Sequence, residues 1–231
     1  MFFPFYDSTY ILVLIGVIVS MMASAKLNAT YQRYSAVRSM CGLTGAEAAK
    51  RLLNSQGIYD VTIRRVPGSL TDHYDPRSKT VNLSDAVYGS TSIAAIGVAA
   101  HECGHAMQDA ADYSPLRIRA ALVPAANLGS QLAWPLILVG LLLGSGGSGL
   151  AFAGIVLFSL AVLFQLVTLP VEYNASHRAV TLLDSTGILA GQEVGQTRSV
   201  LNAAALTYVA AAAASILKLL RLLMLFNRRR D

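Results

Sequence analysis

Residues 97–109 read GVAAHECGHAMQD, and this stretch gives the strongest indication of the fold and chemistry of the chain. His101 and His105 are four positions apart, so on a helix they lie about 40° apart around the axis and share one face. Two imidazoles at this spacing can bind one zinc ion. Glu102 lies about 100° from His101 around the same axis, where a carboxylate can act as general base toward water on the metal. The pattern predicts a zinc-dependent hydrolase.

A purely structural origin of this pattern is the first alternative. The chain has four histidines, and half of them fall within the five residues from His101 to His105. Burying two imidazoles and a carboxylate without partners on an alanine-rich helix would cost several kcal/mol. The metal-binding interpretation is therefore favoured over a chance match.

The composition is typical of a membrane protein. Hydrophobic residues make up 54% of the 231 residues and charged residues only 13%, whereas a soluble domain usually carries about 25% charged residues. The mean hydropathy is +0.51. We expect an N-terminal anchor, a transmembrane hairpin with GSGGSG at its tip, and a C-terminal membrane-associated helix with a basic tail. These segments are predicted at 1–25, 120–171 and 205–231.

A polar part at 26–119 is predicted to carry the motif helix and a small sheet. Thr44 and Glu47 form a capping-box pattern, and Gly57 is placed to end that helix. Three short strands are then expected, within YDVTIRRV, GSLTDHYDP and KTVNLS. Ser90 or Thr91 is expected to cap the motif helix. The fold class is therefore a mainly α membrane protein with a small β-sheet.

A third protein ligand is needed to complete a zinc site of this kind. The pattern with a third histidine downstream fails, because Gln108 and Ala111 stand where Gly and His are required. After Asp112, the next Asp, Glu or His is Glu172, directly after the hydrophobic hairpin. A hairpin brings its two ends together, so Glu172 is the predicted third ligand, in a second catalytic segment at 172–204. The alternative is that Glu172 only marks the membrane boundary.

Membrane topology is predicted from the basic residues. Residues 26–119 contain 11 Lys and Arg, and the hairpin tip at 144–149 contains none. The positive-inside rule places 26–119 and 170–204 in the cytoplasm and the tip outside. The last helix either crosses weakly or packs against the bundle with its basic end inside. We attribute the net charge of +5 to basic residues that orient the apolar spans in the membrane. We therefore expect no nucleic-acid partner.

Three longer strings extend the argument: HECGHAMQ, LTDHYDPRSKTVNLS and LPVEYNASHRA. Together they resemble the YugP-like membrane zinc metallopeptidases, in the neutral zinc metallopeptidase family. The layout is similar to that of the HtpX and Ste24 membrane peptidases, which implies a gluzincin-like catalytic domain on a helical membrane bundle. The resemblance implies His101, His105 and Glu172 as zinc ligands and Glu102 as the catalytic acid.

One position departs from the HtpX-like pattern. Those enzymes tend to carry Asp four residues after the ligand Glu, and Ser176 stands there in this chain. A hydrogen-bond partner for a ligand histidine is therefore expected from Ser176, Asn174 or Asp184.

The expected reaction is hydrolysis of a peptide bond in a protein or peptide substrate, and the HtpX-like similarity implies membrane protein quality control. Glu102 would take a proton from water and pass it to the leaving amine. An oxyanion donor is also needed. His73 and His177 are the catalytic candidates for this role, with Tyr74 and Arg178 as further candidates. The strand at 80–84 could pair with an extended substrate.

Two other function classes remain open from the sequence. A site-2-type intramembrane protease would carry the motif inside a membrane span, and LLDSTG at 182–187 resembles its second motif. However, only about eight apolar residues precede His101, which is short of a span. The second alternative is a non-enzymatic zinc-binding membrane scaffold, which would not need Glu102. The oligomeric state is not predicted.

Overall fold

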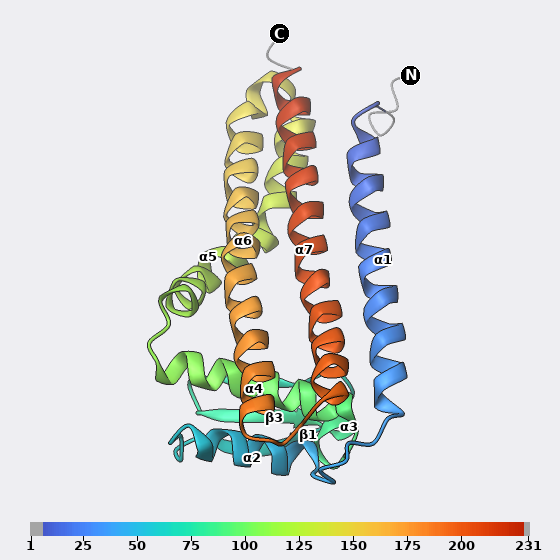
Figure 1. Ribbon diagram of the computed structural model, residues 1–231. Coiled ribbons are helices and arrows are strands. Elements are labelled where there is room, and N and C mark those ends of the chain that lie inside the picture. Colours follow the sequence, from blue (N-terminus) through green and yellow to red (C-terminus); the bar gives the residue numbers. More distant parts are fainter. Residues whose placement is uncertain (1–6, 229–231) are drawn as a thin grey trace. The chain divides into compact units, whose positions relative to one another are not determined.

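The computed structural model describes residues 7–228, apart from the side chain of Ser145, and it is mainly helical with one small sheet (Figure 1). The chain folds into two compact units. The helical unit takes its described residues from Met1–Ser24, Arg117–Leu169 and Thr207–Asp231. The mixed unit consists of Ala25–Leu116 and Pro170–Leu206. The predicted fold class is confirmed.

Four helices among the described residues are long and apolar enough to cross a membrane. One of them overlaps the predicted N-terminal anchor, two overlap the predicted hairpin, and one overlaps the predicted C-terminal helix. These helices are α1 (Tyr10–Ser35), α5 (Ser114–Leu142), α6 (Ser148–Ser185) and α7 (Gln192–Asn227). The predicted hairpin tip is the short 3-10 helix η1 (Gly144–Gly147), where Gly144 has a φ of +63° that favours glycine.

Glycines let α5 and α6 approach closely within the helical unit. A Cβ on Gly140 would lie 2.4 Å from the backbone nitrogen of Ala151, and one on Gly129 would lie 2.5 Å from the carbonyl oxygen of Leu157. Helices in lipid associate through such small residues, because there is no hydrophobic drive between them. The hairpin is therefore a tightly packed pair.

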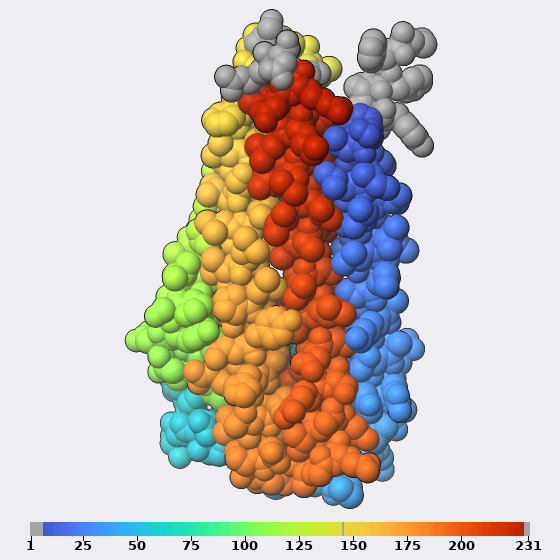
Figure 2. Space-filling model, turned by 45° about the horizontal axis from the view of Figure 1, so that its top comes forward, coloured from blue at the N-terminus to red at the C-terminus, as the bar shows by residue number. Residues whose placement is uncertain are grey.

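The C-terminal half of α7 belongs to the same helical unit. Leu222 is buried against Ile137 of α5 and Ile155 of α6, and Arg221 lies 5.2 Å over the ring of Tyr10 in α1. Figure 2 shows this part of α7 in red, between α6 in yellow-orange and α1 in blue. This half of α7 packs against the other helices of the unit, and whether its basic end lies inside or outside stays a prediction.

The mixed unit begins with the helix that the capping box predicts. In α2 (Gly45–Ser55), Thr44 accepts from the backbone N–H of Glu47, and the Glu47 carboxylate accepts from the N–H of Thr44. Gly57 follows with a φ of +70°. The buried face of α2 packs on α4 (Ile93–Ala110) in the main hydrophobic core. The expected helix boundaries are confirmed.

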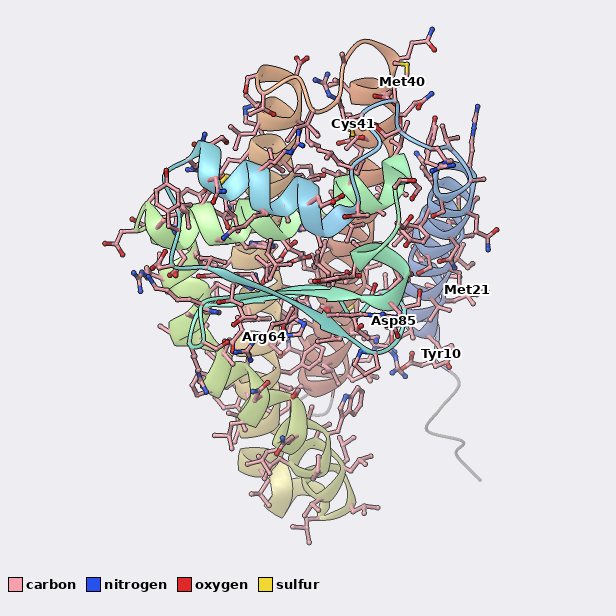
Figure 3. All side chains as sticks on the ribbon, turned by 90° about the horizontal axis from the view of Figure 1, so that it is seen from below. Tyr10, Met21, Met40, Cys41, Arg64 and Asp85 are labelled. Atoms are coloured by element: carbon pink, nitrogen blue, oxygen red, sulfur yellow. The ribbon has the colours of Figure 1, made fainter. Side chains whose placement is uncertain are left out.

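The sheet contains β1 (Thr62–Val66), β3 (Thr80–Ser84) and β2 (His73–Asp75), in that spatial order. β3 pairs parallel with β1 and antiparallel with β2, so both of its edges are occupied. The expectation that TVNLS at 80–84 could accept a substrate strand is therefore wrong, because β1 and β2 form the sheet edges. Figure 3 shows the three strands edge-on, with Arg64 of β1 labelled.

The motif helix starts later than expected. A four-residue helix, α3 (Asp85–Tyr88), precedes it, and Ser92 is the N-cap of α4, accepting from the N–H of Ala95. The expectation of Ser90 or Thr91 at this position is wrong. The hydroxyl of Ser90 instead donates to Ser92. Most of α4 is buried, so its polar side chains must find partners inside the unit.

Candidate metal centre

His101 and His105 of α4 meet Glu172 of α6 inside the mixed unit. One ligand atom from each residue lies within 4.8 Å of the others. Oε2 of Glu172 is 3.2 Å from Nε2 of His101 and 3.6 Å from Nε2 of His105. Glu172 is buried, with only 2% of its surface exposed. Glu172, which is far from the histidine pair in sequence, thus supplies the third potential metal ligand.

The donor set fits zinc in chemistry and in size. Two imidazole nitrogens and one carboxylate oxygen are ligands typical of catalytic zinc sites. Zinc–ligand bonds of about 2.0–2.1 Å in a tetrahedron place neighbouring ligand atoms about 3.3 Å apart. The two separations that involve Glu172, 3.2 Å and 3.6 Å, lie on either side of that value, and the ligand atoms of the two histidines lie within 4.8 Å of each other.

The course of α6 explains why Glu172 reaches the motif helix. The helix continues through Pro170 to Ser185, so residues 172 and 176 share one face. Ser176 is buried, and its hydroxyl oxygen lies 3.1 Å from Nδ1 of His101. One face of α6 therefore offers a carboxylate to one nitrogen of His101 and a hydroxyl to the other.

His105 has a different hydrogen-bond partner. Its Nδ1 lies 3.0 Å from Oε1 of Gln108, which is fully buried. The Gln108 amide group donates in turn to the carbonyl of Val171 and to Oδ1 of Asn174. Of the three residues expected to support a ligand histidine, Ser176 does so directly and Asn174 through Gln108. Asp184 is exposed on α6.

Glu102 is buried on α4 next to the ligand pair, with 8% of its surface exposed. Its position is also visible in the electrostatics of the site. Burial by itself would lower the pKa of His105, but contact with Glu172 and the charge of Glu102 outweigh burial and raise this pKa. The charge of Glu102 therefore acts on His105 across the site.

The other sequence-based catalytic candidates lie outside this cluster. His73 is exposed on β2, and its ring nitrogens contact the carbonyl of Thr71 and the amide of Asn82. His177 is exposed on α6, five positions after Glu172 and so about 140° from it around the axis. An oxyanion role for either histidine stays a prediction that this geometry does not support.

The two further oxyanion candidates are engaged elsewhere. The hydroxyl of Tyr74 donates to Asp109 at 2.9 Å, and burial together with that carboxylate raises the pKa of Tyr74. Nε of Arg178 donates to Oδ1 of Asn174 at 2.8 Å. Arg178 thus joins the hydrogen bonds around Gln108.

Gln108 is the residue of the site that the sequence reasoning missed. In the sequence, Gln108 stands out only because it does not fit the three-histidine pattern. The available signal was its position three residues after His105, because residues three apart are neighbours on one helix face. A polar side chain on that face of a buried helix needs a partner, and His105 is the nearest one.

Comparison with known proteins identifies the family of the chain. Residues 9–227 match the family described as "Putative neutral zinc metallopeptidase". The chain is 48% identical over 213 residues to the "Putative membrane protease YugP" of Bacillus subtilis (strain 168). That alignment covers 92% of this chain and 94% of the relative. No solved structure matches the chain.

Proposed function

Because the chain belongs to the neutral zinc metallopeptidase family, we propose that it is a membrane endopeptidase that hydrolyses peptide bonds in protein or peptide substrates. His101, His105 and Glu172 would hold the zinc ion. The observation that carries this proposal is the position of Oε2 of Glu172, which lies within 3.6 Å of Nε2 of both histidines.

The chemistry divides between the metal and Glu102. Bound zinc would supply a Lewis acid and lower the pKa of a coordinated water to about 7. Glu102 would accept the proton of the attacking water and deliver it to the amine that leaves. Its burial beside the ligands supports this role, because a carboxylate shielded from bulk water keeps its proton for the leaving group.

We place the site on the cytoplasmic side of the cell membrane. Residues 26–119 carry 11 Lys and Arg, and the hairpin tip carries none. Since the end of α7 packs near the tip end of the hairpin, at Ile137 and Ile155, α7 would cross the membrane as well. Its end and the start of α1 would then lie outside. A cytoplasmic site in a multi-pass protein suits membrane protein quality control.

The two alternatives have less support. A site-2-type protease needs the motif inside a membrane span, but α4 is not among the helices of residues 7–228 that are long and apolar enough to cross. A zinc-binding scaffold would have no use for a buried carboxylate beside the ligands, and burying Glu102 without a function is costly.

Casein cleavage by the full chain, purified in detergent, tests the proposal. The wild type is expected to cleave casein, to stop when a chelator is added, and to recover with zinc. Glu102→Gln should keep zinc and lose cleavage. If Glu102→Gln cleaves as fast as the wild type, the enzyme mechanism is wrong. If the wild type holds zinc without cleaving any protein or peptide, the scaffold alternative is favoured.

A further inference from the structure

We propose that Gln108 is a positioning residue that fixes the tautomer of His105, with the proton on Nδ1 and a free lone pair on Nε2. This inference rests on the proposed zinc site, because Nε2 is the nitrogen that faces Glu172. Only a nitrogen without a proton can bind a metal. A ring held in the other tautomer would present N–H to the metal position and would have to exchange its proton first.

The carbonyl of Val171 determines how the Gln108 amide is oriented. A carbonyl oxygen accepts hydrogen bonds and cannot donate them. The Gln108 atom that lies 2.8 Å from Val171 O must therefore be the NH₂ nitrogen, Nε2. The other amide atom, which faces His105, must then be the oxygen.

Asn174 supports the same orientation. Its Oδ1 accepts from Nε of Arg178 at 2.8 Å, and a guanidinium group only donates. The oxygen of Asn174 is therefore the atom that faces Gln108, and it accepts the second N–H of Gln108 at 3.0 Å. Both donors of the Gln108 amide are thus used on α6.

The consequence for His105 follows from donor and acceptor count. Oε1 of Gln108 lies 3.0 Å from Nδ1 of His105 and can only accept. Nδ1 must therefore carry the proton, and Nε2 of the neutral ring is left bare. The hydrogen bonds converge on Asn174: Arg178 and Gln108 both donate to its Oδ1, and His105 donates to Gln108.

His101 has no such constraint from Ser176. A hydroxyl group can donate or accept, so the 3.1 Å contact between Ser176 Oγ and Nδ1 of His101 allows either tautomer. The two ligand histidines therefore differ: Gln108 locks one of them, and Ser176 only orients the other.

The network also ties the ligand residues of two helices together. Gln108 and His105 belong to α4, while Val171 and Asn174 flank Glu172 on α6. Loss of the Gln108 amide would remove a hydrogen bond to His105 and two bonds to the segment that carries Glu172. Comparable partners of metal-bound histidines change metal affinity by about 10–100-fold when they are replaced.

The test uses the full chain in detergent with ¹⁵N-labelled histidine, and it reads the tautomer without metal and without activity. At alkaline pH, long-range ¹H–¹⁵N spectra of the metal-free wild type should show His105 with its proton on Nδ1. The four histidines can be assigned from single substitutions. Gln108→Met removes the amide at similar volume, and His105 should then show a mixture of tautomers. Zinc affinity, measured by chelator competition, should fall about 10–100-fold.

Two further variants separate positioning from stability. Gln108→Glu keeps an oxygen acceptor, so His105 should keep the proton on Nδ1 even if the bonds to α6 are lost. Leu52→Ala opens the same hydrophobic core away from the ligands, and it should lower the melting temperature while the tautomer and the zinc affinity of the folded protein stay unchanged.

The outcomes distinguish this inference from the proposed function. An unchanged His105 tautomer in Gln108→Met would overturn the inference, and so would loss of the Nδ1 proton in Gln108→Glu. An unchanged zinc affinity in Gln108→Met would overturn it as well. If the wild type shows the expected tautomer but binds no zinc, the proposed function fails while the role of Gln108 in setting the tautomer stands.

Discussion

Gly104 of α4 lies directly against the backbone of Ala175 in α6. A Cβ on Gly104 would be 2.5 Å from the carbonyl oxygen of Ala175 and 3.0 Å from its carbonyl carbon. Gly104 stands between the two ligand histidines, and Ala175 stands between Glu172 and His177 on α6. The absence of one side chain thus sets the distance between the helices that carry the zinc ligands.

We expect Gly104→Ala to damage both the fold and the metal site. The added methyl group must push α6 away, and overpacking of this kind typically costs about 1–3 kcal/mol. The same shift moves Glu172 away from the histidines. Thermal unfolding and zinc competition should therefore show a lower melting temperature and weaker zinc binding.

A second glycine provides the control for this substitution. Gly195 of α7 is exposed and has no atoms near the position of an added Cβ. Replacing a helical Gly with Ala at such a site usually stabilises by about 0.4–1 kcal/mol. If Gly104→Ala behaves like Gly195→Ala, the close approach of α4 and α6 does not position the ligands.

The pKa of His105 predicts opposite pH dependences for the metal-free and the zinc-bound protein. This pKa is raised in the folded, metal-free protein above the ordinary value of about 6.5. A raised pKa stabilises the metal-free fold fully below about pH 6.5, and that contribution is lost as the pH rises through the raised value. Zinc requires the neutral ring, so protons compete with it over the same range.

The difference in melting temperature between zinc-loaded and zinc-free protein should therefore shrink as the pH is lowered from about 8 towards 6. Differential scanning calorimetry at fixed free zinc measures this difference. His73→Gln, which changes an exposed histidine outside the cluster, should show the same narrowing as the wild type. A difference that stays constant over this pH range would show that His105 does not exchange its proton for zinc.

His177 and His73 offer a test of the oxyanion candidates. We expect His177→Ala and His73→Ala to keep zinc and most of the wild-type kcat, because both rings are exposed outside the cluster. Removal of a true oxyanion donor lowers kcat by about 10²–10³-fold. Steady-state casein hydrolysis decides between these results, and a loss of that size in either variant would restore that histidine to the active site.

Much of this fold was readable from local patterns. The capping box at Thr44 and Glu47 involves only neighbouring residues, and it predicted α2 correctly. Long uncharged stretches likewise predicted the apolar helices, because length and composition are local properties. The pairing of β3 depends on which strands lie next to it, and the residues of TVNLS do not indicate which strands these are. Its use as a substrate-binding edge was therefore predicted wrongly.

The site divides in the same way. The spacing of His101 and His105 predicted that the two rings share one helix face. Because a hairpin brings its two ends together, the sequence also predicted that Glu172 lies close to both histidines. Gln108 was missed because its partners on α6 are more than 60 positions away in sequence. Helix spacing alone connects it to His105. Its orientation comes from a backbone carbonyl and an asparagine that only the folded chain brings close.

Membrane topology can be measured by cysteine labelling in intact cells. In a chain with Cys41→Ser and Cys103→Ala, Gly146→Cys at the hairpin tip should react with a membrane-impermeant maleimide added from outside. Tyr59→Cys, at a side chain that is 72% exposed, should react only after permeabilisation. Asn227→Cys should behave like Gly146→Cys if α7 crosses. The reverse pattern would place the metal site outside the cell.

The central claim is that Glu172 joins His101 and His105 in holding one zinc ion. The most direct test is the zinc content per chain after purification in the presence of a weak chelator, with Glu172→Ala compared to Glu102→Gln. Both variants remove one buried carboxylate from the same site. The wild type and Glu102→Gln should retain about one zinc ion per chain, and Glu172→Ala should retain almost none. Full zinc content in Glu172→Ala would contradict the account.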